Sequence, residues 1–230
     1  MIDRIRKFFA KAFIKFKPRS TYNNWSLHPI SRSFGLDRGK PIDRFYIDIF
    51  LEHHSYLIRG ICCEISEDTY LRRYGVGVTD YLVFDFDRTN VKATIFGDLA
   101  DPSALPENAL DCFVLTQTLN FIFDIKSAVK GIHRMLKHNG VALVTVAGIS
   151  QISRYDMERW GDFWRFTILS ILTLFEEVFG KDNVDAQSYG NVLSAKSFLD
   201  GLCAEELTLE ELLHVDPDYQ IVITLKAFKR

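Results

Sequence analysis

The stretch GDLADPSALPENALDCFVLTQTLNFIFDIKSAVKGIHRMLKHNGVALVTV, residues 97–146, contains the pattern that decides the fold. Residues 111–119 form a short apolar run rich in β-branched residues and Phe, which predicts a strand. Residues 140–148, GVALVTVAG, predict a second strand for the same reason. Between them, apolar residues recur at helical spacing, and Lys and His in a last turn with Gly beyond it predict a helix end. The helical positions and this end are Ile125, Val129, Ile132, Leu136, Lys137, His138 and Gly140.

The rest of the chain extends this alternation in both directions. Further strands are predicted over 58–65, 74–84, 92–99 and 216–229, and helices over 41–57 and 166–180. Strands that alternate with helices form a mostly parallel sheet covered on both faces. The sequence therefore predicts one α/β domain over residues 58–230, preceded by a linker and cap helix over residues 20–57.

The composition is that of a soluble globular protein. Of the 230 residues, 47% are hydrophobic and 25% are charged, and 19 are Phe. The four cysteines form no CxxC pair and no cluster with His at metal-ligand spacing, which indicates reduced core thiols and no metal site.

Residues 1–19 form a separate segment. The apolar positions Ile2, Ile5, Phe9, Phe13 and Phe16 recur at helical spacing, and seven basic residues against Asp3 give +6. This predicts a basic amphipathic helix. Two interpretations stay open: the helix lies on an anionic membrane or an acidic protein partner, or it docks on its own domain.

The charge balance and the absence of long apolar runs limit the location and partners. The net charge of −2 leaves −8 on the rest of the chain, which argues against nucleic acid as a partner. No apolar run is long enough to span a membrane. We expect a cytoplasmic protein, with peripheral contact at the inner membrane face if the helix binds lipid.

Polar side chains at the predicted strand ends are the candidate ligands of a cofactor, because α/β sheets bind ligands beyond the carboxyl ends of their strands. A carboxylate at the end of the second strand in chain order, predicted over 74–84, suits ribose hydroxyls. Asp80 is the first choice for this role, with Asp85 and Asp87 as rivals. The other candidates are Glu64, Asp98, Thr116 and Gln117.

Residues 97–146 resemble the core of Rossmann-like S-adenosylmethionine-dependent methyltransferases of the type 11 kind. The likeness rests on Gly-Asp, Leu-Pro before an acid-led strand, and an Arg-Met-Leu-Lys helix end. It implies a Rossmann-like methyltransferase fold with an N-terminal helical extension and S-adenosylmethionine as the cofactor. It places Asp98 and Leu99 beside the adenine, Thr116 and Gln117 near the methionine part, and matches Glu64 to the acid that ends the first strand.

The loop after Glu64 departs from that family, which has a glycine-rich loop there. Ser66, Asp68 and Tyr70 occupy this region, and we place Ser66 among the cofactor contacts. Either a modified loop still holds the cofactor, or the domain is a non-catalytic module that partners a glycosyltransferase. A nicotinamide-dependent oxidoreductase fits the fold but lacks the glycine fingerprint.

Residues 148–167, GISQISRYDMERWGDFWRFT, are dense in aromatic and charged groups that suit a sugar. Their end and residues 34–47 resemble methyltransferases of bacterial cell-surface glycan biosynthesis. This implies O-methylation of a sugar or polysaccharide intermediate, a small-molecule or glycan acceptor. An alcohol nucleophile benefits from a general base. The candidates are Asp156, Tyr155 and His28 for catalysis, and Arg159, Trp160, Trp164 and Arg165 for acceptor binding.

Overall fold

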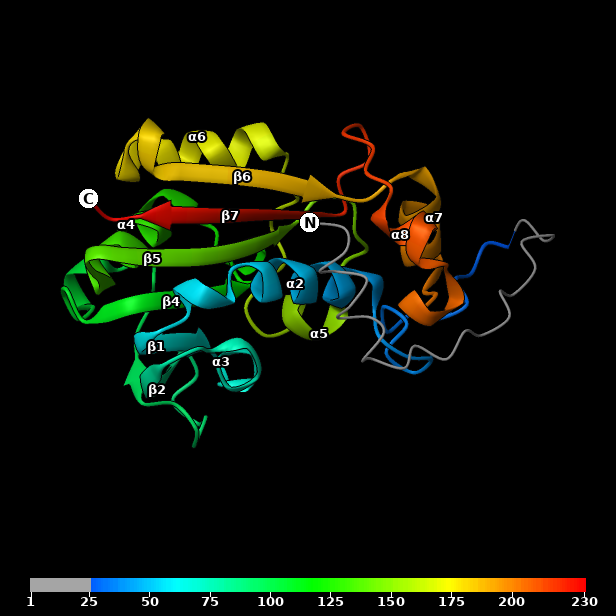
Figure 1. Cartoon of the computed structure of the whole chain (residues 1–230). Helices are drawn as coiled ribbons and strands as arrows, with labels where there is room; N and C mark the ends of the chain where they lie inside the picture. The colour runs from blue at the N-terminus through cyan, green and yellow to red at the C-terminus, as the bar shows by residue number, and fades with distance from the viewer. Residues whose placement is uncertain (1–25) are drawn as a thin grey trace.

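The computed structural model describes residues 26–230, so the helix predicted over residues 1–19 lies outside the described residues. One seven-stranded sheet forms its centre, in the order β3-β2-β1-β4-β5-β7-β6 (Figure 1). β7 runs antiparallel to β5 and β6, and the other neighbours are parallel. The predicted mostly parallel sheet is confirmed. The strands are β1 (Gly60–Ile65), β2 (Val78–Asp85), β3 (Ile95–Phe96), β4 (Leu110–Thr116), β5 (Leu136–Ala147), β6 (Val184–Tyr189) and β7 (Val222–Phe228).

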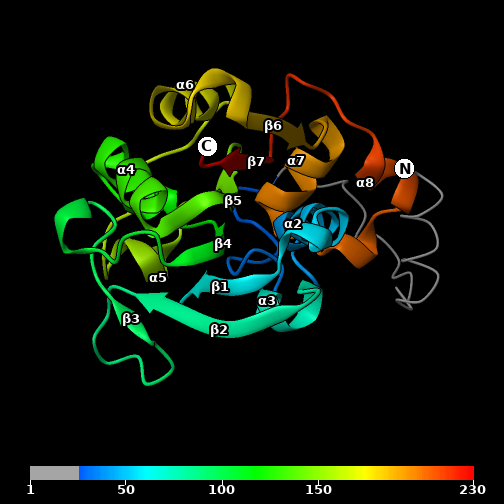
Figure 2. The ribbon, with the colours of Figure 1, turned by 60° about the vertical axis from the view of Figure 1, so that its left-hand side comes forward.

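Helices cover both faces of the sheet (Figure 2). One face packs against α2 (Ile42–His53), α3 (Thr69–Tyr74), α7 (Val192–Asp200) and α8 (Leu209–Leu213). The other face packs against α4 (Ile125–Met135) and α6 (Ile168–Phe179). The short α5 (Arg154–Met157) lies in the connection from β5 to α6. Single 3₁₀ turns span Ser55–Leu57, Pro102–Ala104, Leu119–Phe121, Lys181–Asn183 and Ala204–Glu206.

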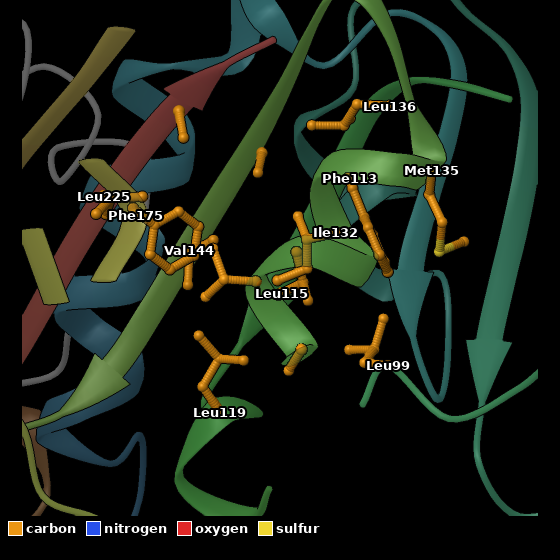
Figure 3. Close-up of a cluster of buried hydrophobic side chains, with 14 of the residues drawn as sticks. Leu99, Phe113, Leu115, Leu119, Ile132, Met135, Leu136, Val144, Phe175 and Leu225 are labelled. Atoms are coloured by element: carbon orange, nitrogen blue, oxygen red, sulfur yellow. The ribbon is translucent and has the colours of Figure 1, made fainter. Parts of the chain in front are cut away.

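The central strands are apolar on both sides because each side faces a helical layer. Cys63 and Phe113 belong to the core under α4 and α6, while their chain neighbours Cys62 and Cys112 belong to the core under α2. In Figure 3, Phe113 and Val144 lie among side chains of α4 and α6. All four cysteines are buried with free thiols. Burial on both faces explains why these strands read as continuous apolar runs rather than alternating ones.

The predicted elements need three corrections. The helix predicted to include Lys137 and His138 ends at Met135, because Leu136 already pairs with Leu110 as the start of β5. The third strand is only Ile95–Phe96. The helix assigned to a cap is α2, whose apolar side chains are buried in the core, so it is an integral layer of the fold.

The segment before α2 is tied across to α7 and the turn that follows it. The N–H of Ile30 donates to the carbonyl of Asp200 at 2.8 Å, and the Arg38 guanidinium forms a two-pronged ion pair with the buried Glu206. The N–H of Lys40 donates to Glu205 at 2.9 Å. These bonds fix residues 30–41 next to the carboxyl ends of the strands. Among the described residues, no helix is long and apolar enough to cross a membrane.

Close packing of α4 on the loop after β3 makes a stability prediction. A Cβ added at Gly131 would lie 2.3 Å from the backbone carbonyl oxygen of Leu99. We expect Gly131→Ala to lower the free energy of unfolding by about 1–3 kcal/mol, although Ala favours helix by about 1 kcal/mol. Urea unfolding measures this. The exposed neighbour Lys130 provides the control Lys130→Ala, which should change stability by less than about 0.5 kcal/mol. A stabilised Gly131→Ala variant would contradict the packing of this loop on α4.

Candidate functional site

A cavity of about 1110 Å³ lies at the carboxyl ends of β1, β2 and β4. β1 and β4 are neighbours in the sheet, but the chain leaves β1 toward β2 and leaves β4 toward β5. Ligands of open α/β sheets bind where strand order reverses in this way. The volume is at or above the upper end of the usual range for small-molecule sites, about 300–1,000 Å³. It therefore has room for two ligands at once.

Both strands at this reversal end on a non-glycine residue with left-handed backbone. Ser66 follows β1 with φ 64°, and Gln117 follows β4 with φ 51°. Such conformations are uncommon for residues with a side chain and cluster at functional sites. Ser66 thus takes the backbone conformation that a glycine would adopt after β1. Both residues line the cavity.

Glu64 is a buried structural acid at the end of β1. Its side chain is only 2% exposed and its Oε2 accepts the N–H of Leu71 in α3 at 2.9 Å. Burial raises the pKa of Glu64 to about 7, and the N–H groups of Leu71 and Tyr70 oppose part of that rise. Glu64 holds α3 against the end of β1 while it lines the cavity.

The carboxylate that ends β2 is Asp85, not Asp80. Asp80 lies near the start of the strand, exposed and bonded to the hydroxyl of Thr79, and it does not line the cavity. The first choice from the sequence is therefore corrected, because the strand continues five residues beyond Asp80. Asp85 lines the cavity and accepts the amide N–H of Asn90 at 2.6 Å. Asp87 bonds the exposed Thr89 and lies outside the cavity wall.

The loop after β3 supplies Asp98 and Leu99. Both line the cavity, and the exposed Asp98 accepts the N–H of Ala100 at 2.8 Å. The Leu99 side chain is 3% exposed and packs in the core under α4, as Figure 3 shows. The core therefore uses most of the apolar surface of Leu99, and a ligand would meet only its edge.

Asn120 organises the loop after β4, beside Thr116 and Gln117, which line the cavity. Their place near the methionine part of the cofactor stays a prediction. Asn120 is 3% exposed, and its side chain donates to Gln117 at 3.2 Å and accepts from the N–H of Ala147 at 3.3 Å. Its main-chain carbonyl accepts the N–H groups of Phe163 and Trp164. Sequence reasoning missed Asn120, since one Asn in an apolar stretch carries no pattern.

The segment over residues 148–167 forms one wall of the cavity. Asp156 accepts the hydroxyl of Ser153 and the indole N–H of Trp160, the latter at 3.1 Å, and both Asp156 and Trp160 line the cavity. Arg165 also lines it, but its guanidinium is bound by Asp162 and by the carbonyl of Gln151. Burial acts to raise the pKa of Asp162, but Arg165 and the N–H of Ser153 together outweigh it, so the pKa is lowered.

The remaining predicted residues do not line the cavity. Arg159 stacks over the exposed ring of Tyr155 at 3.5 Å and bonds its carbonyl, so the two satisfy each other on the outer surface. His28 is exposed, with Arg32 3.4 Å from its ring nitrogen. Trp164 is partly exposed outside the cavity lining and donates its indole N–H to the carbonyl of Ile122 at 3.1 Å.

The start of α2 brings charged residues to the cavity that the sequence did not single out. Lys40 and Arg73 both pair with Asp48, whose side chain is 4% exposed. Arg44 faces Tyr70, and burial raises the pKa of that phenol while Arg44 opposes the rise. Only tertiary packing joins these residues, so spacing in the sequence gave no indication.

Carboxylates outnumber cations in the cavity lining, which favours a cationic ligand. The carboxylates are Asp43, Asp48, Glu64, Glu67, Asp85, Asp98, Asp124, Asp156 and Asp162, and the cations are Lys40, Arg44, Arg73, Lys92 and Arg165. Within residues 26–230, no group of three or more His, Cys, Asp or Glu side chains could hold a metal ion.

Comparison with known proteins agrees with this geometry. Residues 60–144, from the first residue of β1 into β5, match the family model described as a methyltransferase domain. No curated protein sequence matches the chain. The domain match supports an S-adenosylmethionine-dependent methyltransferase as the enzyme class and S-adenosylmethionine as the cofactor.

Solved structures with low sequence identity share the fold. A SAM-dependent methyltransferase from Archaeoglobus fulgidus has a TM-score of 0.51 at 10% identity, covering 81% of this chain and 94% of that chain. One from Thermotoga maritima has a TM-score of 0.52 at 14% identity, covering 82% and 92%. The [4+2]-cyclase SpnF has a TM-score of 0.53 at 15% identity, covering 89% and 87%. The predicted methyltransferase fold is confirmed.

The buried Glu64 makes the stability of this fold depend on pH. A carboxyl whose folded pKa is raised binds its proton more tightly when folded, so its contribution to stability falls as pH rises from about 4.5 to about 7. We expect Glu64→Gln to remove this loss and to gain about 2–4 kcal/mol relative to the wild type between pH 4.5 and pH 8. Urea unfolding of both proteins at these two pH values measures the difference. Parallel pH profiles would show that Glu64 does not titrate between the folded and unfolded states.

Proposed function

We propose that the protein is an S-adenosylmethionine-dependent O-methyltransferase whose acceptor is a sugar or polysaccharide intermediate. One observation carries the acceptor side: Asp156 and Trp160, bonded to each other, stand in the wall of the cavity into which the strand ends point. An aromatic ring and a carboxylate side by side suit a sugar, because the ring takes an apolar sugar face and the carboxylate takes hydroxyls.

The strand-end residues fit the cofactor. Asp85 accepts the Asn90 amide on one oxygen and the N–H of Asp87 on the other, and each oxygen keeps a lone pair for a ribose hydroxyl. Asp98 suits the adenine amino group. Ser66 and Gln117 have left-handed backbone and line the cavity, and in this proposal their turns take the place of the missing glycines. The excess of carboxylates suits a sulfonium cation. When bound, the cofactor supplies an electrophilic methyl group.

Asp156 is the group we assign to the acceptor hydroxyl. Methylation of an alcohol oxygen would form an O–CH₃ bond while the S–CH₃ bond of the sulfonium breaks and S-adenosylhomocysteine leaves. The hydroxyl proton is released to a carboxylate within hydrogen-bond reach. Ser153 and Trp160 hold the Asp156 carboxylate in place. Alignment of the hydroxyl with the methyl group supplies much of the acceleration of such a displacement. Asp156 and Trp160 together provide that alignment.

The proposed location is the cytoplasmic face of a membrane. Residues 1–18 carry the basic amphipathic pattern, which suits a helix lying on anionic lipid. An acidic protein partner would meet the same basic surface.

Cofactor binding tests the assignment of the strand ends. We expect Asp85→Asn to weaken S-adenosylmethionine and S-adenosylhomocysteine binding at least about tenfold, because the amide replaces one of the two acceptor oxygens of the carboxylate by an NH₂ donor. Asp98→Ala should weaken binding to a similar or greater extent. Asp80→Asn is the matched control, since Asp80 lies on the same strand outside the cavity. Calorimetry measures all four proteins, and equal affinities for the Asp80 and Asp85 variants would refute the ribose assignment.

Methyl transfer tests the acceptor class. Labelled methyl donor with free hexoses, nucleotide sugars and oligosaccharides should yield a methyl ether on one of them, and Asp156→Asn should lower kcat/KM by about 10²–10⁴. Glu158→Gln is the control, because Glu158 is exposed on the same segment and does not line the cavity. Cofactor binding without transfer to any of these acceptors would instead favour a non-catalytic module that partners a glycosyltransferase.

A further inference from the structure

Apolar side chains that are largely exposed surround the opening of the cavity. Leu36, Phe86 and Phe123 are 67%, 66% and 70% exposed, and Phe163 is 47% exposed. All four also line the cavity, so they gather around one opening although they come from four separate segments. We call these four residues the apolar rim. Large exposed apolar groups gathered at one place mark an interaction surface more often than a plain solvent-facing one.

Part of the apolar rim is held rigidly in its exposed position. The ring of Phe123 meets Phe163 edge to face at 5.5 Å and stacks on Trp164 at 5.8 Å. The N–H groups of Phe163 and Trp164 donate to the carbonyl of the buried Asn120. These contacts keep the rings from folding inward into the core. The fold therefore presents them to whatever lies outside the opening.

The basic N-terminal segment joins the described chain next to the same opening. The side chain of Gln151, which lines the cavity, donates to the carbonyl of Arg32 at 2.8 Å. Five residues separate Arg32 from Ser26, the first residue described, and these six steps along the chain span at most about 22 Å. The sequence before Ser26 includes the basic amphipathic pattern of residues 1–19. At the cavity edge the exposed Lys92 pairs with Glu67 at 3.9 Å, so the net positive charge lies in the N-terminal segment.

We propose that the apolar rim inserts into the headgroup region of an anionic bilayer, so that the cavity opens onto the membrane surface. Phe and Leu side chains with no hydrogen-bonding group are suited to this region, and Trp next to them is typical of interfacial contacts. The cavity lining is rich in carboxylates, so the attraction to anionic lipid comes from residues 1–19, whose sequence carries seven basic residues against Asp3 and a second apolar face. Two linked weak sites bind one surface far more tightly than either alone. The inference rests on the proposed membrane association and is independent of methyl transfer.

Tryptophan fluorescence tests the contact directly. With Trp25 replaced by Phe, the remaining reporters are Trp164, which stacks on Phe123 of the apolar rim, and Trp160, which lines the same cavity. Vesicles of brominated phosphatidylcholine and phosphatidylglycerol quench a Trp that enters the bilayer. We expect quenching by these vesicles, and the double change Phe86→Ser with Phe123→Ser should lower the lipid partition coefficient roughly tenfold or more. The control is Tyr56→Ser, because Tyr56 is 59% exposed just beyond the far end of α2.

Further variants distinguish this inference from the other proposals. A chain lacking residues 1–18 should bind vesicles more weakly while its bound fraction is still quenched. Equal partition and quenching for the rim variant and the Tyr56 control would overturn the rim inference and leave the N-terminal helix as the sole contact. Unchanged quenching with a raised KM for a soluble sugar would also overturn it, and would assign Phe123 to the acceptor. Calorimetry with S-adenosylmethionine confirms that each variant is folded.

Discussion

The divergence of the chain at the ends of β1 and β4 is the constraint on which the site depends. These strands are paired neighbours, yet one leads outward to β2 and the other to β5. Each must therefore turn sharply at once, and each does so through a residue with left-handed backbone, Ser66 and Gln117. Both conformations cost energy, of order 1–3 kcal/mol each, and survive because the surrounding sheet fixes them. The crevice between these turns is the cavity.

Glu64 shows how the fold dispenses with a glycine loop after β1. Glycines there would let the backbone of the loop pass close to a ligand. Here Ser66 alone takes the left-handed position, and Glu64 bonds the N–H of Leu71, so the loop leads straight into α3. Burying a carboxylate is unfavourable, which its raised pKa expresses. The backbone donors at the start of α3 offset part of that cost, so the acid acts as a structural link as well as a wall of the cavity.

The fold could be predicted from the sequence because it depends on local patterns, whereas the site depends on long-range packing. The apolar runs of β1, β4 and β5 and the helical spacing of α4 are visible in short windows. The choice of Asp80 over Asp85 was wrong because the end of a strand depends on where its partner strand stops. A short stretch of sequence does not contain the partner strand. Tyr155 and Arg159 looked like ligands by residue type, but they satisfy each other on the surface. Asn120 and Arg44 reach the cavity only through contacts with distant segments.

Asn120 couples the two halves of the molecule that the proposals assign to different ligands. Its side chain joins the turn after β4 to the end of β5, which belongs to the cofactor side. Its main-chain carbonyl accepts the N–H groups of Phe163 and Trp164, which belong to the rim side. Because Asn120 is almost fully buried, water does not compete for its hydrogen bonds, and these bonds keep the residue in place. A shift of the turn after β4 would therefore move the aromatic segment with it. The position of the rim and the position of the strand end are thus set by one residue, through its main-chain carbonyl and its side chain.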